Sequence, residues 1–142
     1  NVAPILLIIA GSGALKEIFI VSGTSKYIAS LLLDIDINPL ILGWAIAALI
    51  RVCVGSATIA GLTAVGVLLP MIQAQTGLSP ELMVLAIGSG SLMFSHINDG
   101  GFWLFKEYFN LSIKDTIKTW SIMESIVSII GLLGVLVLDQ II

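Results

Sequence analysis

Residues 88–105 have the sequence "GSGSLMFSHINDGGFWLF" and interrupt a chain that is otherwise strongly apolar. The stretch contains the only histidine, His96, together with the carboxylate of Asp99 and a concentration of Gly, Ser and Asn. Polar groups are costly in an apolar environment unless they are hydrogen-bonded or solvated. The interruption therefore predicts that the chain here meets either a ligand cavity or other polar groups of its own backbone.

The composition places the chain in a membrane. Hydrophobic residues make up 58% of its 142 residues and charged residues only 11%, against roughly 25% charged in a soluble domain. The mean hydropathy is +1.12. We predict an all-α integral membrane protein that contacts the lipid bilayer. The net charge of −3 and the absence of a basic run exclude nucleic acid as a partner.

Segment lengths predict which parts cross the bilayer, since one helical crossing takes about 20 residues. The run from Thr119 to Leu138 contains one charge, Glu124, and predicts a last transmembrane helix over 114–141. Glu124 follows Lys118 closely, so we expect it to reach the membrane interface, with a role in coupling as the alternative. The charge-poor arms within 1–33 are each too short to cross, which favours a re-entrant hairpin over a truncated full-length helix.

Two further segments carry internal breaks. Residues 40–69 would form a helix of about 45 Å, longer than one untilted crossing, so we predict a broken helix over 38–69 with its break at Gly55 and Ser56. In hydrocarbon, such a break is tolerated only where the backbone is buried in protein or lines a wet cavity.

The second interrupted segment is predicted at residues 80–110. Pro70 and Pro80 are expected to end helices, because proline lacks a backbone N–H. An apolar helix is then expected from Pro80 to Phe94, followed by the polar interruption. Two interrupted helices are typical of secondary transporters, whose half-helix ends hold an ion or an anionic substrate.

Hydroxyl side chains at the breaks are candidates for binding a substrate: Ser56, Thr58, Ser89 and Ser91. Ser and Thr in membrane helices also hydrogen-bond to their own backbone, which is the alternative interpretation for each. Arg51 is costly in an apolar run and needs a partner. It either pairs with a substrate carboxylate in a cavity, or it reaches the interface or pairs with a carboxylate of the protein.

His96 and Asp99 are candidates for carrying a proton, because histidine titrates near neutral pH and a buried carboxylate can shift toward it. The alternative is that both tie the interrupted backbone together. One histidine and one aspartate are too few for a metal site, and we expect no metal or other cofactor. The same architecture would suit another organic-anion carrier or a channel subunit. A membrane enzyme is disfavoured, because no nucleophile–base pair is evident.

Three blocks carry a resemblance to a known family: "GSGALKEIFIVSGTSKYIASLL" (11–32), "RVCVGSATIAGLTAVGVLLP" (51–70) and "SPELMVLAIGSGSLMFSHINDGGFWLFKEYFNLSIKDTIKTWSIMESI" (79–126). In order and spacing they resemble the C-terminal third of the gluconate permease family, the gluconate:proton symporters.

The resemblance implies a multi-pass protein of the bacterial inner membrane that imports gluconate or a related sugar acid together with protons. It implies that residues 1–142 form one membrane region, a half-repeat that works with an N-terminal part of the same transporter. A homo-oligomer stays an open alternative. The family's motif positions fall on Gly55, Ser56, Ala57 and Thr58, on Gly88, Ser89, Gly90 and Ser91, and on His96, Asn98 and Asp99.

Overall fold

The computed structural model describes residues 37–74 and 77–141 as continuous chain, together with Ala14, Ile18, residues 21–23 and Tyr27. The predicted re-entrant hairpin over residues 1–33 lies outside the described residues, apart from these few positions.

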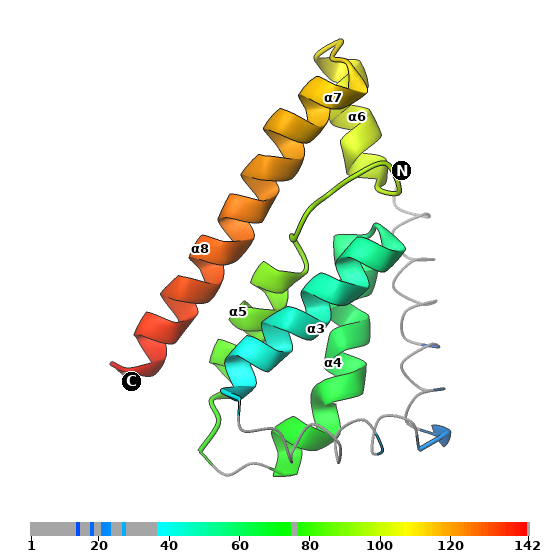
Figure 1. The fold of residues 1–142 in the computed structure, drawn as a ribbon. Coiled ribbons are helices and arrows are strands. Elements are labelled where there is room, and N and C mark those ends of the chain that lie inside the picture. Colours follow the sequence, from blue (N-terminus) through cyan, green and yellow to red (C-terminus); the bar gives the residue numbers. More distant parts are fainter. Residues whose placement is uncertain are drawn as a thin grey trace.

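Every regular element within 37–74 and 77–141 is a helix, and these ranges contain no strand (Figure 1). In chain order the helices are α3 (Pro39–Val54), α4 (Ala57–Ala74), α5 (Pro80–Gly90), α6 (Gly100–Tyr108), α7 (Ile113–Thr116), the π-helix η1 (Ile117–Ser121) and α8 (Ile122–Asp139). The predicted all-α class is therefore confirmed for this part of the chain.

Helix α3 lies at the centre and packs against α4, α5 and α8. Small residues bring the backbones together: a Cβ added to Gly43 would collide with the Met83 sulfur, and one added to Gly90 would collide with the Trp44 carbonyl. The Trp44 indole N–H donates to the backbone oxygen and the hydroxyl of Ser128, at 3.2 and 3.0 Å. Close backbone approach of this kind is the usual basis of helix association in membranes.

The starts of α3 and α5 follow directly from the sequence. Asn38 caps α3 by accepting a hydrogen bond from the Leu40 N–H at 2.8 Å, and Pro39 follows it. Ser79 caps α5 in the same way, and Pro80 follows it. A capping Asn or Ser satisfies a free helix N–H, and proline fits the first helical position because it has no N–H to satisfy.

Two predicted helix ends are wrong. Helix α4 continues through Pro70 to Ala74, because a proline near the end of a packed apolar helix removes few hydrogen bonds and is tolerated. Helix α5 ends at Gly90 and not at Phe94. Residues 91–94 form turns, and Phe94 has a φ of +44°, which is incompatible with a continuing helix.

The break predicted at Gly55 and Ser56 lies where expected. Helix α3 stops at Val54 and α4 starts at Ala57. The chain reverses direction there, so that α3 and α4 pack against each other instead of continuing one axis (Figure 1).

Elements α7, η1 and α8 join into one helix, Ile113–Asp139, of 27 residues. Among the residues that the structure describes, it is the one helix long and apolar enough to cross a membrane. It overlaps the crossing predicted at 114–141 but ends two residues earlier, at Asp139. Large apolar side chains are exposed along it: Ile122, Met123, Ile126, Val127, Ile129, Ile130, Leu133, Val137 and Leu138.

Candidate functional site

The candidate site is built around Arg51 in the last turn of α3. Its side chain is 2% exposed, and its Nη2 atom donates to the Oδ2 atom of Asp99 at 2.6 Å and to the Oε2 atom of Glu124 at 3.2 Å. Asp99 precedes α6 and Glu124 lies in α8. The arginine therefore joins three segments that are far apart in the sequence, and it pairs with carboxylates of the protein itself.

Two nitrogens of this guanidinium have no hydrogen-bond partner among the described residues. The Nε and Nη1 atoms of Arg51 are buried and have no hydrogen-bond partner within the described part of the chain. A guanidinium has five N–H donors in a fixed plane. Leaving a buried donor without an acceptor costs about 1–3 kcal/mol, so these atoms favour binding of a further acceptor.

Asp99 is held in place by several donors. Its Oδ1 atom accepts from the Gly101 N–H at 3.0 Å, which caps the start of α6. Its Oδ2 atom accepts from the hydroxyl of Ser95 as well as from Arg51. Ser95 is 1% exposed and in turn accepts a hydrogen bond from the Trp120 indole N–H at 3.0 Å. The network thus extends from α3 to η1 through the buried Arg51 and Ser95 and the partly buried Asp99.

His96 and Asn98 lie at the C-terminal end of α3. The Asn98 amide donates to the Val52 carbonyl at 3.0 Å and to the Cys53 carbonyl at 3.4 Å, and the His96 Nε2 atom lies 3.0 Å from the Val52 carbonyl. The last carbonyls of a helix lack intrahelical partners. The contacts with His96 and Asn98 provide partners for these carbonyls. They fit the interpretation that His96 ties the interrupted backbone together.

Gly55 makes this close approach feasible. It has a φ of +79°, and a Cβ atom at this position would collide with the backbone of Asn98. Glycine adopts this conformation without a steric penalty. We define the polar junction as Arg51, Gly55, His96, Asn98 and Asp99, where residues 95–99 dock on the end of α3.

The remaining predicted hydroxyls behave differently. The hydroxyls of Ser89 and Ser91 donate to the carbonyls of Ala86 and Gly88 in their own helix, at 2.9 and 2.7 Å. Ser56 accepts a hydrogen bond of 3.4 Å from the Ile59 N–H at the start of α4, as a helix cap does. The serines at the end of α5 therefore satisfy their hydroxyls locally.

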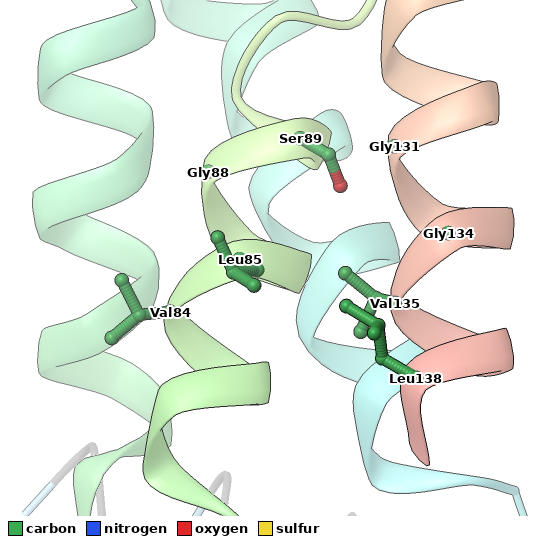
Figure 2. Close-up of a pocket in the computed structure, with 8 residues that line it drawn as sticks. All are labelled: Val84, Leu85, Gly88, Ser89, Gly131, Gly134, Val135 and Leu138. Carbon is green, nitrogen blue, oxygen red and sulfur yellow. The ribbon is translucent and has the colours of Figure 1, made fainter. Parts of the chain in front are cut away.

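Gly88 and Ser89 line an apolar groove and not the polar junction. The groove lies between α5 and α8 and has a volume of about 540 Å³ (Figure 2). Its walls are Val84, Leu85, Gly88, Ser89, Gly131, Gly134, Val135 and Leu138. Thr58 and Gly88 line a second apolar groove of about 420 Å³ between α4 and α5. Neither groove contains Arg51.

Glu124 was expected at the membrane interface, with a role in coupling only as the alternative, and Ser95 and Trp120 were not among the predicted site residues. A signal for Glu124 was present, because an ionisable residue within an apolar crossing is by default a functional candidate. The structure places its carboxylate beside Arg51 and not at the end of the helix. Within residues 37–74 and 77–141, no three or more metal-ligating side chains come together.

Comparison with known proteins gives a consistent assignment. A model of the GntP family permease matches residues 1–142. The chain is 56% identical over 141 residues to a high-affinity gluconate transporter of Escherichia coli K12, covering 99% of this chain and 32% of the relative. It is 49% identical over 140 residues to the Gnt-II system L-idonate transporter of the same organism, with the same coverage. No solved structure gives a significant match.

A gluconate permease of Bacillus subtilis is 43% identical over 142 residues, which is 100% of this chain and 32% of the relative. The chain thus spans about a third of the length of these curated relatives. The resemblance found in the sequence is confirmed: this chain belongs to the GntP family of permeases.

Proposed function

We propose that this chain is the C-terminal third of a permease that imports gluconate or a related sugar acid by proton symport across a bacterial inner membrane. The family match and the printed names of the relatives, which transport gluconate or L-idonate, support a sugar-acid substrate. The remaining part of the permease would complete the binding site, as in transporters built from two repeats.

The observation that carries this proposal is the buried guanidinium of Arg51. Two of its nitrogens have no acceptor among the described residues, and a sugar acid offers one carboxylate as an acceptor. Arginine is suited to carboxylates because its planar group donates two parallel hydrogen bonds. An inside-negative potential opposes anion uptake by about 2.3 kcal/mol per 100 mV, so co-transport of a proton would cancel this cost.

We further propose that the two interruptions, between α3 and α4 and between α5 and α6, lie near the middle of the bilayer and line the substrate pathway. Ser56, Thr58 and Asn98 are the candidates for the sugar hydroxyls, together with backbone groups at Gly55. Gly88, Ser89, Gly90 and Ser91 have weaker support, since the hydroxyls of both serines bond within α5.

The test is uptake of labelled gluconate by the full-length permease in proteoliposomes, with and without an inward proton gradient. For the wild type we expect saturable uptake that depends on the gradient and is inhibited by L-idonate. Arg51→Lys keeps the charge but loses the planar donor geometry, so we expect the half-saturation concentration to rise at least tenfold. Lys106→Arg, at an exposed pair with Glu107, is the matched control and should leave it unchanged.

Two outcomes would contradict the proposal. Uptake that does not saturate or does not respond to the proton gradient would favour a channel subunit or another anion carrier. An unchanged half-saturation concentration in Arg51→Lys would remove Arg51 from substrate binding and leave the helix ends as the anion site.

A further inference from the structure

Two carboxylates of this structure share one nitrogen atom of Arg51. The Nη2 atom of Arg51 serves both Asp99, at 2.6 Å, and Glu124, at 3.2 Å. With both carboxylates ionised, one positive and two negative charges leave the partly buried cluster with a net charge of −1. Such a charge is costly in a low-dielectric environment, so the cluster favours binding of one proton.

The two carboxylates are not equivalent. Asp99 also accepts from the Gly101 N–H and from the Ser95 hydroxyl, and these bonds anchor the start of α6. Glu124 is held by the longer of the two Arg51 contacts. Hydrogen bonds to an ionised carboxylate favour its charged form, which favours Asp99 as the group that stays ionised.

We propose that Glu124 carries the coupling proton, while Asp99 remains the permanent counter-ion of Arg51. This inference rests on the proposed function and adds to it the residue that links proton and substrate. A proton from the uptake side binds the Glu124 carboxylate, which then becomes a neutral acid and no longer needs the charge of Arg51.

Protonation of Glu124 creates the substrate site. It frees one of the two N–H donors of Nη2 from its hydrogen bond to Glu124. Whichever one is released, its neighbour in the guanidinium plane is an N–H of either Nε or Nη1, and both of those atoms lack a partner in the described chain. The released N–H and its neighbour form one two-donor edge that a substrate carboxylate can accept in parallel.

The charges balance in this scheme. Before loading, Arg51, Asp99 and Glu124 sum to −1. After loading, the protonated Glu124 contributes zero and the substrate carboxylate contributes −1, so that the sum is again −1. Release of the substrate on the other side returns Arg51 to Glu124, which then loses its proton. One proton and one monovalent anion therefore move together without adding charge to the cluster.

Other titratable groups on the neighbouring elements are already engaged or exposed. The His96 Nε2 atom contacts the Val52 carbonyl. The only charged residue of α5, Glu81, is exposed and bonded to Ser79 at the start of the helix. On the side of α6 and η1, Lys106 pairs with Glu107, and Lys114, Asp115 and Lys118 are exposed. Among the described residues, Arg51 and Asp99 are thus the charged groups that face Glu124.

The experiment compares Glu124→Gln with Glu107→Gln in the full-length permease in proteoliposomes. Gln resembles the protonated acid, so Glu124→Gln should keep exchange of internal for external gluconate within about threefold of wild type. It should lose accumulation driven by a proton gradient by at least tenfold, and it should lose gluconate-induced proton uptake. Glu107→Gln makes the same chemical change at an exposed residue and should keep all three activities.

Gradient-driven accumulation that survives in Glu124→Gln overturns the proton role of Glu124 and leaves the proposed function intact. Loss of exchange in a variant that melts like the wild type also overturns it, because Glu124 would then be needed for binding. Absence of gluconate transport by the wild type overturns both. If Glu124→Gln does not fold, Glu124→Asp serves instead: a shifted pH midpoint of accumulation supports the proposal, and an identical midpoint overturns it.

Discussion

Two regions of this molecule depend on a glycine for close approach, and the glycine serves a different purpose in each. At the polar junction, Gly55 ends a helix and lets the backbone of Asn98 approach its last carbonyls. In the groove between α5 and α8, Gly131 instead admits the side chain of Ser89, whose Cβ would lie 2.7 Å from an added methyl group (Figure 2). Glycine thus allows the chain to break and be capped in one region, and it allows two helices to pack closely in the other.

The difference lies in which hydrogen-bonding groups need a partner. Helix α3 ends inside the molecule, so its carbonyls require donors from another segment, and His96 and Asn98 contact them. In α5, the backbone stays helical through Gly90, and the serine hydroxyls return to their own helix. A charged cluster can form beside the first kind of site, whereas the second kind is lined by apolar side chains.

The largest expected effect is the loss of the charge at the polar junction. Arg51→Gln leaves two partly buried carboxylates without their cation, and breaking a fully buried ion pair costs about 3–5 kcal/mol, which sets the upper limit here. Thermal unfolding of the purified full-length permease should show this loss. The triple variant Arg51→Gln, Asp99→Asn, Glu124→Gln should recover most of the stability without transport. A triple variant as unstable as the single one would show that packing of Arg51, and not its charge, stabilises the region.

A second prediction compares one glycine from each region. Gly55→Ala places a side chain in the left-handed conformation, at a cost of about 1–3 kcal/mol, and against the Asn98 backbone. Gly88→Ala meets nothing within 4 Å and replaces a helical glycine, which is worth roughly 0.5–1 kcal/mol in favour of alanine. Unfolding midpoints should therefore move in opposite directions. Equal destabilisation by both would mean that the two regions do not differ in the way described.

Sequence reasoning located the interruptions but not their partners. The break at Gly55 and the start of α5 follow from local rules, since glycine and Ser-Pro act within a few residues. The end of α5 at Gly90 could not be predicted, because nothing in the sequence "GSLMF" (90–94) excludes a longer helix. The chain leaves the helix there because the following segment contacts the end of α3. Pro70 was overrated as a helix end because the cost of proline depends on packing around it.

The site shows the same limit more sharply. The cost of a buried arginine predicted that Arg51 would have a partner, but charge patterns cannot say which carboxylate of several it meets. Glu124 is 73 positions away in the sequence, and only the antiparallel packing of α8 beside α3 brings the two together. Ser95 and Trp120 carry no signal of their own, because serine and tryptophan are both common in membrane proteins.

The third prediction tests the cap on α3. Asn98→Ala removes donors to the Val52 and Cys53 carbonyls, and a net hydrogen bond contributes about 0.5–1.5 kcal/mol. We expect a loss of about 1–2 kcal/mol in the free energy of unfolding, with faster hydrogen exchange at the end of α3. Asn98→Asp keeps the side-chain shape but removes the donors, so it should be at least as damaging. An Asp variant as stable as wild type would show that the amide is not the cap.

The smallest effect is expected where a hydroxyl bonds to its own helix. Ser91 follows the last residue of α5, and Ser91→Ala removes a local bond to the Gly88 carbonyl three residues earlier, so stability should change by less than about 0.5 kcal/mol. Ser95→Ala is the matched change at the other region. It leaves the Trp120 indole N–H without its acceptor and removes a donor from Asp99, at a cost of about 1–3 kcal/mol. Unfolding measurements on the two variants decide whether serine contributes through its neighbours or only through its own backbone. Reversed effects would contradict the distinction drawn here, because Ser91 would then contribute more to stability than Ser95 does.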